Sequence, residues 1–357
     1  MDIIAARLHN QHLAGNPLKT AQQVVAHLGA VQSQEYAAAK WALAQRLGST
    51  TNAQLDELFN SGQILRTHVM RPTWHFVTPE DILWMVELTA PRISQAMAYY
   101  NRKLELDRPF FDRSNHIIGA ALAGGNFLTR QELAQALAAK GVSASGQRLG
   151  HVMMQAELDG VICSGPLKGK QFTYALLSER APHAKRLGKD ESLALLAQRY
   201  FKSHGPATAK DFAWWSGLTN TDAKQGVQLA KNLASETING TEYWFGEGAK
   251  EAAHIPKLML LSVYDEYVIA YSDYTPVFPP HAQSLVKLLG NAWLNYVVVK
   301  DGHVIGSFRR QVKPKELHLE FRLVVSVSKA DKALIASAAK QYAAFFGLPL
   351  RVSYSAS

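Results

Sequence analysis

The sequence contains little that would cross-link the chain or hold it in a membrane. Cys163 is the single cysteine, which excludes an internal disulfide framework and a thiolate zinc cluster. No run of about 18 uncharged apolar residues occurs, and the mean hydropathy is −0.11. The opening stretch MDIIAARLHNQHLAGN mixes charged residues and histidine with apolar ones, unlike a signal peptide. We therefore expect a soluble, reduced, cytoplasmic protein.

Several common catalytic motifs are also missing. The sequence has no GxxxxGK[ST] loop, no GxGxxG after a predicted strand and no HExxH, so nucleotide-binding and zinc-protease interpretations lack their loops and ligands. His68 and His75 are a close histidine pair near a predicted hairpin, but no neighbouring carboxylate supplies a third ligand. We expect no metal and no cofactor.

Acidic residues are outnumbered. The chain has 38 Lys and Arg against 29 Asp and Glu, a formal net charge of +9. Such an excess favours polyanionic partners, because neutralising phosphates releases counterions. With 357 residues, 47% of them hydrophobic, the chain can form more than one buried core.

The first third of the sequence is mainly helical by periodicity. A switch to two short β-type runs around Pro72 predicts a hairpin over 64–77. Thr78 and Pro79 then predict a helix start, followed by a long helical region to residue 112. The helices predicted before the hairpin span 2–12, 20–30, 35–46 and 52–61.

An internal repeat follows with an offset of 79 residues. Residues 127–134 and 206–213 each pair a threonine with an acid three positions later, which is typical of a helix-opening capping box. In both copies a helix precedes, another follows, and a strand–turn–strand ends the unit. This order is the winged-helix plan, and the segment ending in the 64–77 hairpin is a looser third copy.

After Pro256 the pattern changes to strands. The first element is a buried run at 258–261. A hairpin follows from 294–299 to 304–309 across the Asp301-Gly302 turn, and after it comes a basic turn at 311–315. The last predicted elements are a strand at 317–323, a helix at 330–345 and a strand at 350–354. We predict a mainly helical α+β fold of three tandem winged-helix repeats with a C-terminal β-containing unit. The predicted boundaries are 1–110, 111–180, 186–250 and 255–357.

Three polar segments are candidates for chemistry. Gln32 and Gln34 lie on nearly opposite sides of a regular helix, so they could act together only from irregular backbone; the alternative is ordinary helix-end polarity. The 66–75 hairpin could grip phosphates and stack on a base, or could be a wing with a buried tryptophan and solvated arginines. Asp265-Glu266-Tyr267, with the arginines at 309–310, suggests acid–base work or an arginine clamp. The favoured alternative there is an ion pair holding the C-terminal unit to the repeats.

Four segments that follow one another in this order resemble those of a known family, and the resemblance covers nearly the whole chain. The marks are 28–34 (LGAVQSQ), 65–77 (LRTHVMRPTWHFV), 265–267 (DEY) and 301–310, with its DG turn, VIG and RR. The sequence resembles the winged-helix DNA-binding family that contains the AlkZ-like DNA glycosylases. The resemblance implies tandem winged helices forming a concave basic surface, and removal of alkylated bases, including bulky adducts and interstrand crosslinks.

The resemblance also implies site residues. The family's catalytic pair is two glutamines separated by an aliphatic residue, which corresponds here to Gln32 and Gln34, with the polar Ser33 as a departure. We expect a monofunctional glycosylase of cationic alkylated purines that works as a monomer on double-stranded DNA, without a membrane or a required protein partner. The alternatives are a non-catalytic DNA-binding regulator or damage sensor, and a structural role that leaves the charge unexplained. We expect site support from Asp265, Glu266 and Tyr267, and DNA contacts from Arg66, Thr67, His68, Arg71, Trp74, His75, Arg309, Arg310, Lys313 and Lys315.

Overall fold

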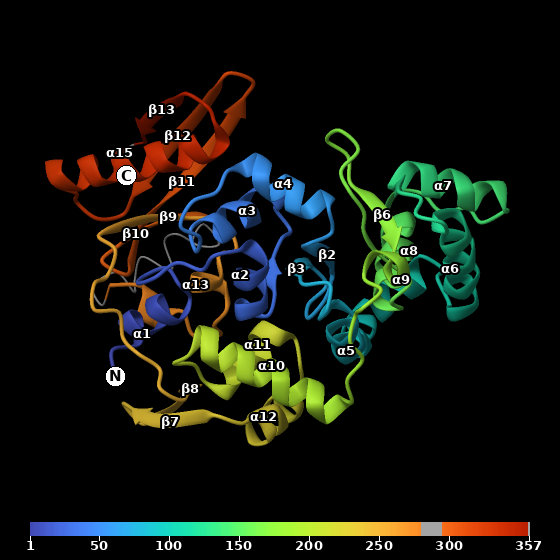
Figure 1. Cartoon of the computed structure of the whole chain (residues 1–357), viewed down its shortest axis with the longest axis horizontal. Helices are drawn as coiled ribbons and strands as arrows, with labels where there is room; N and C mark the ends of the chain where they lie inside the picture. Colours follow the sequence, from blue (N-terminus) through green and yellow to red (C-terminus); the bar gives the residue numbers. More distant parts are fainter. Residues whose placement is uncertain (280–294, 356–357) are drawn as a thin grey trace. The chain divides into compact units, whose positions relative to one another are not determined.

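The computed structural model describes residues 1–279 and 295–355, which fold into two compact units (Figure 1). Unit 1 consists of Met1–Leu55, Leu196–Trp215 and Ala230–Ser357; unit 2 consists of Asp56–Leu195 and Ser216–Leu229. Each unit therefore gathers segments that are far apart in the sequence.

Unit 1 begins with short helices close to the predicted ones. These elements are α1 (Ile3–Asn10), α2 (Ala21–Leu28), β1 (Val31–Gln32) and α3 (Tyr36–Ala44), and α4 (Asn52–Asn60) crosses the division between units. Asp2 caps α1 by accepting the main-chain N–H groups of Ile4 and Ala5, and Thr20 forms a capping box with Gln23 at α2. The four predicted N-terminal helices are confirmed, each ending within two residues of its predicted limits.

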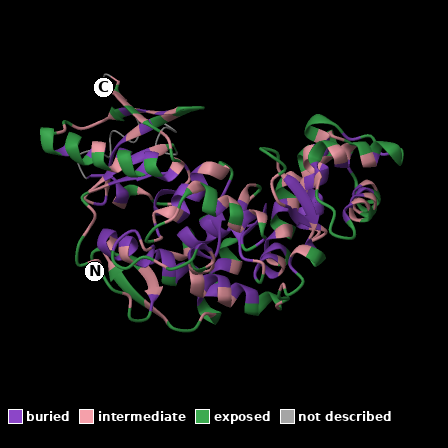
Figure 2. Cartoon of the chain, turned by 45° about the horizontal axis from the view of Figure 1, so that its top comes forward, coloured by how far each residue is buried: buried purple, intermediate pink, exposed green. Residues whose placement is uncertain are grey.

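The C-terminal part of unit 1 is a five-stranded sheet in the order β13-β12-β11-β10-β9. Its members are β9 (Leu258–Leu261), β10 (Tyr296–Lys300), β11 (His303–Lys313), β12 (Glu316–Leu323) and β13 (Leu350–Tyr354). Only the β12–β13 pair is parallel. The helix α15 (Lys329–Phe346) packs on this sheet and alternates buried and exposed positions along its length (Figures 1 and 2). In the described residues between β9 and β10, the chain forms two short helices, α13 (Glu266–Ile269) and η1 (Thr275–Val277).

The turn between β10 and β11 has the predicted two residues. Asp301 and Gly302 have φ of 47° and 81°, the left-handed pair that a two-residue hairpin turn requires. A side chain at position 302 would also collide with Ile4. The predicted start of this hairpin at Leu294 lies outside the described residues. The basic 311–315 segment is mostly strand rather than turn, because β11 and β12 pair as far as Lys313 and Glu316.

Unit 2 contains the other predicted hairpin. β2 (Leu65–His68) and β3 (Trp74–Val77) pair antiparallel, as predicted. The following helix α5 (Ile82–Lys103) starts later than predicted, after a turn over 78–81 in which Thr78 Oγ1 donates to Asp81 Oδ2. The predicted long helical region is interrupted at 104–107, where Glu105 has a φ of 52°, before α6 (Arg108–Leu122) begins.

The predicted repeat is confirmed in its element order. The first copy contains α6, the short β4 (Leu128–Thr129), α7 (Arg130–Ala139), α8 (Gly146–Leu158), β5 (Ile162–Ser164) and β6 (Thr173–Leu176), followed by α9 (Leu177–Arg180). The second contains α10 (Lys189–His204), α11 (Ala209–Ser216), α12 (Asn220–Leu229), β7 (Leu233–Ile238) and β8 (Thr241–Gly246). Both predicted capping boxes form: Thr129 with Glu132, and Thr208 with Asp211.

Each unit has its own apolar core. In unit 1 a cluster including Leu8, Leu261 and Val297 joins α1 to the sheet. In unit 2 a cluster including Ile118, Leu133 and Val152 fills the space among α6, α7 and α8. None of the helices in the described residues is long and apolar enough to cross a bilayer.

Candidate glutamine site and nucleic-acid interface

The two predicted catalytic glutamines lie where β1 ends. Gln32 is the last residue of β1 and is 9% exposed, and residues 33–35 are irregular before α3 begins. Gln34 is exposed. The irregular backbone that an i, i+2 pair needs is therefore present, and the two side chains occupy different environments.

A buried carboxylate holds the strand that carries Gln32. Glu266 Oε1 accepts the main-chain N–H of Gln32 at 3.1 Å, and Oε2 accepts the indole N–H of Trp215 at 2.8 Å. The side chain of Glu266 is 1% exposed. His204 Nε2 lies 3.4 Å from Oε2; burial lowers the pKa of this imidazole below its ordinary value, although Glu266 acts in the opposite direction. Glu266 thus fixes the position of the Gln32 backbone through this hydrogen bond.

The neighbouring carboxylate fixes a different segment. Asp265 accepts two hydrogen bonds from the Arg46 guanidinium, at 2.9 and 3.0 Å, and both side chains are buried. Arg46 also donates to Gln11 Oε1 at 3.0 Å and to the Ala42 carbonyl at 2.8 Å. The ion pair favoured from the sequence is confirmed, but its cation is Arg46 and not Arg309 or Arg310. A bidentate buried pair of this kind sets geometry strictly, because neither partner can be solvated elsewhere.

A chain of buried hydrogen bonds continues from this pair. Gln11 Nε2 donates to the Tyr271 hydroxyl at 2.9 Å, which in turn donates to the His204 carbonyl at 2.8 Å. The Arg7 guanidinium carbon lies 3.6 Å from the centre of the Tyr271 ring. Tyr267, predicted to support the site, donates its hydroxyl to the Gly302 carbonyl at 2.6 Å and so ties α13 to the β10–β11 turn.

Sequence reasoning missed most of this network. Its additional members are Arg7, Gln11, Arg46, His204 and Trp215. One available signal was Arg46 itself, a charged residue set between the apolar positions Leu43 and Leu47.

The β2–β3 hairpin uses its polar residues inside unit 2. The Arg66 guanidinium lies between the rings of Trp74 and Phe172, 4.3 and 4.6 Å from their centres. His68 pairs with Glu157, and both are buried. All four residues of β2 are buried, because both faces of this strand are covered.

This burial changes the expected set of DNA contacts. Thr67 and His75 are fully buried, and Arg66 and His68 nearly so, so these side chains offer almost no surface to the phosphates of a duplex. Trp74 is only partly buried and Arg66 is not solvated, so the alternative of a buried tryptophan with solvated arginines is not found either. Arg71 and Trp74 remain partly exposed.

The basic residues at the end of β11 are more accessible. Arg309, Lys313 and Lys315 are exposed. Arg310 is half-buried, with its guanidinium carbon 5.2 Å from the centre of the Tyr296 ring and 5.4 Å from that of Phe346. This part of the chain therefore offers three exposed cations for phosphate contacts, of which Lys313 also pairs with Glu316 at 3.7 Å.

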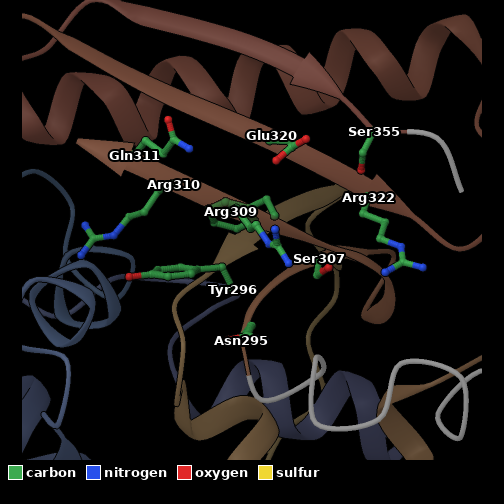
Figure 3. Close-up of a pocket in the computed structure, with 10 residues that line it drawn as sticks. Asn295, Tyr296, Ser307, Arg309, Arg310, Gln311, Glu320, Arg322 and Ser355 are labelled. Carbon is green, nitrogen blue, oxygen red and sulfur yellow. The ribbon is translucent and has the colours of Figure 1, made fainter. Parts of the chain in front are cut away.

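A polar pocket of about 660 Å³ lies beside these strands. In the view of Figure 3 the guanidinium groups of Arg309, Arg310 and Arg322 extend to the side on which Tyr296 and Ser307 lie. Arg322 was missed from the sequence, although the alternation of polar residues along β12 could have indicated it. Neither Gln32 nor Gln34 lines this pocket. The described residues contain no group of three or more His, Cys, Asp or Glu side chains suited to a metal ion.

The comparison with a solved structure shows the fold. Over 98% of its length the chain is similar in structure to the Streptomyces sahachiroi DNA glycosylase AlkZ, with a TM-score of 0.78 and 22% identity, and the match covers 98% of that chain. This comparison shows a shared mixed α+β fold.

The sequence comparisons then give the family. The family described as DNA glycosylase AlkZ-like matches residues 25–345, and the chain belongs to this family. It is also similar to the interstrand DNA cross-link repair glycosylase of Streptomyces sahachiroi, with 27% identity over 321 residues, 85% of this chain and 86% of that protein. The predicted resemblance to the AlkZ-like DNA glycosylases is confirmed.

Proposed function

We propose that the protein is a monofunctional DNA glycosylase that hydrolyses the N-glycosidic bond of cationic alkylated purines in double-stranded DNA. The observation that supports the proposal most directly is the Gln32–Gln34 segment in a member of the AlkZ-like DNA glycosylases. Gln32 ends β1 and is anchored on buried Glu266, and the backbone is irregular from residue 33 to 35. Interstrand crosslinks and bulky adducts belong to the proposed substrate range, because a relative is named as a crosslink repair glycosylase.

The chemistry of the amide side chain limits how these residues can act. An amide does not titrate in the useful range, so neither glutamine is a general base. Each carbonyl oxygen can accept a hydrogen bond from a water and orient it toward the anomeric carbon, and the amide dipole can stabilise the cationic sugar. By analogy with oxyanion-hole donors, each such interaction is worth about 2–4 kcal/mol.

Glu266 does not replace the missing base. Its side chain is buried, and its two oxygens already accept hydrogen bonds from Gln32 and Trp215. A site of this kind acts on a base that is already a good leaving group. Purines alkylated at N7 or N3 carry a positive charge and leave without protonation, whereas uracil does not.

The DNA-binding surface that we propose is narrower than the sequence predicted. In unit 1 it consists of the exposed Arg309, Lys313 and Lys315 and the half-buried Arg310. In unit 2 we propose separate contacts from the partly exposed Arg71 and Trp74. Exposed cations of this kind bind phosphates and set the register of the protein on the duplex. We also propose that the two confirmed helix–helix–helix–hairpin segments and the N-terminal one are winged helices, and that the protein acts as a monomer.

The test is base excision from two duplexes, one carrying 7-methylguanine and one carrying uracil, each followed by alkaline cleavage at abasic sites. We expect release of 7-methylguanine and no comparable release of uracil. Comparable release of both would refute this account of the site. Binding without excision of either base would leave the alternative, a non-catalytic DNA-binding protein.

Gln34→Ala separates catalysis from binding. Because Gln34 is exposed, we expect this variant to lose excision and to keep most of its DNA affinity. The exposed Gln135 on α7 provides the matched control, Gln135→Ala, which should keep both. If binding and excision fall together in Gln34→Ala, this residue has a structural role and the catalytic assignment fails.

A further inference from the structure

Unit 2 contains a cavity of about 480 Å³ that the proposed reaction does not use. It lies among the C-terminal part of α5, the helix α8, the first residue of α7 and the β2–β3 hairpin. We propose that this cavity binds one nucleotide, with the base against its aromatic and methionine wall and the phosphate at Lys103 and Arg130. The volume is within the range of ordinary small-molecule sites.

The wall of the cavity suits a flat, polarisable ring. Met97, Met153 and Met154 contribute thioethers, which adapt to aromatic surfaces. Trp74 and Tyr100 contribute aromatic rings to the lining. The Trp74 ring already packs against Arg66 and His68, at 4.3 and 4.4 Å from its centre, so Tyr100, which is 53% exposed, is the ring on which a base can stack. Aromatic side chains exposed beside a cavity are the stacking platforms that bind unpaired bases in other proteins.

The charge of the lining selects an anion. Lys103 and Arg130 both line the cavity, and no carboxylate is present among its described lining residues. Glu157 is buried, pairs with His68 and is not among the lining residues. Arg130 donates through Nη2 to the Gly146 carbonyl at 3.1 Å, which restrains its guanidinium group beside the cavity. A guanidinium held in this way can bind a phosphate through its remaining N–H groups.

The polar groups of the lining match a heterocycle better than a plain hydrocarbon ring. His151 Nδ1 lies 2.7 Å from Asn101 Oδ1, and because that oxygen can only accept, Nδ1 carries the proton. Burial lowers the pKa of His151, which favours the neutral ring and leaves Nε2 as an acceptor. Gln147 adds an amide with both donor and acceptor groups. A nucleobase has donors and acceptors on its edge that complement such a set.

The methionines provide the readout. Three of the seven methionines of the chain line the cavity, and Met1, Met85 and Met259 lie elsewhere and serve as internal references. With ¹³C-methyl methionine labelling, titration with dGMP should shift the NMR signals of Met97, Met153 and Met154 and leave the reference signals unchanged. Deoxyguanosine and inorganic phosphate, titrated separately, should each bind about tenfold more weakly, because each lacks half of the recognised groups.

Further titrations distinguish two sources of the same chemistry. Shifts with free dGMP identify a free nucleotide as a ligand. Shifts that require a duplex with one unpaired nucleotide, and are absent with a fully paired duplex, identify an extrahelical nucleotide within DNA. If neither probe shifts the three cavity methionines, or if phosphate alone gives the full effect, the proposal is overturned. Excision of 7-methylguanine is a separate measurement, so the two proposals can fail independently.

Two substitutions test the role of Arg130. Arg130→Gln should weaken dGMP binding about tenfold and leave deoxyguanosine binding unchanged, because a charge-assisted bond to phosphate is removed. Lys170→Gln, at an exposed position of the same unit, is the charge-matched control. Gly150→Ala acts without removing a charge, because its Cβ would lie 2.9 Å from Arg130 Nη2 and displace the guanidinium, while alanine favours helix α8. Unchanged dGMP affinity in both variants would overturn the assignment of the phosphate position.

Discussion

Glu266→Gln tests whether the buried carboxylate positions Gln32. In the structure the two oxygens of Glu266 accept from different donors: the main-chain N–H of Gln32 at 3.1 Å and the indole N–H of Trp215 at 2.8 Å. A glutamine side chain has almost the same shape but offers one oxygen and one NH₂ group. Whichever way the amide is turned, one of the two donors then faces another donor.

The cost follows from burial. A buried donor left without an acceptor, together with the loss of a charged acceptor, lowers the free energy of unfolding by about 2–3 kcal/mol. The donor at Gln32 belongs to the strand that carries the proposed catalytic pair, so we also expect slower excision. DNA affinity should change little, because Glu266 is 1% exposed and cannot contact DNA.

The assays are urea unfolding followed by tryptophan fluorescence, single-turnover excision of 7-methylguanine, and DNA binding. Glu247→Gln is the matched control, because it removes the same charge from an exposed position in the same unit. If Glu266→Gln unfolds and excises like Glu247→Gln, the carboxylate does not hold Gln32 and the positioning argument is wrong.

Two further predictions concern DNA binding and pH. Replacing both exposed lysines, Lys313 and Lys315, with glutamine should reduce the slope of log affinity against log salt by about 2, because each phosphate no longer neutralised contributes about 0.9. Fluorescence anisotropy across a salt series measures this slope. An unchanged slope would exclude both lysines from the interface. Burial lowers the pKa of His27 to about 4 from 6.5, and its Nε2 lies 2.6 Å from the Asn10 carbonyl. Since the unfolded chain binds the proton first, stability should fall as the pH decreases from 6.5 toward 4, by at most about 3 kcal/mol, and should not change from this cause above pH 6.5. His27→Gln should unfold with a smaller pH dependence over this range, and equal pH dependence in both proteins would contradict the assignment.

The features that the sequence predicted correctly depend on neighbouring residues. The Asp301-Gly302 turn, the capping box of Thr129 with Glu132 and the irregular backbone after β1 each involve residues within a few positions of one another. Local geometry restricts such segments to few conformations, so residue types and spacing are sufficient to predict them.

The interactions that were missed join distant segments. Arg46 and Asp265 are 219 residues apart, and His68 and Glu157 are 89 residues apart. Sequence periodicity does not predict such pairs, because the residues around each partner show no unusual pattern. The burial of Arg66 between Trp74 and Phe172 was missed for the same reason, since Phe172 lies on a segment far along the chain.

The adjacency of Asp265 and Glu266 restricts how this family member can change its length. Asp265 binds Arg46, and Glu266 binds the strand that ends at Gln32. Two neighbouring residues therefore hold two separate segments of the chain. A one-residue insertion or deletion just before α13 would shift both acids by one position. The hydrogen bonds to Arg46 and to Gln32 would then be lost together. Length variation among relatives should therefore occur in exposed turns such as 239–240, while the spacing from β9 to α13 stays constant.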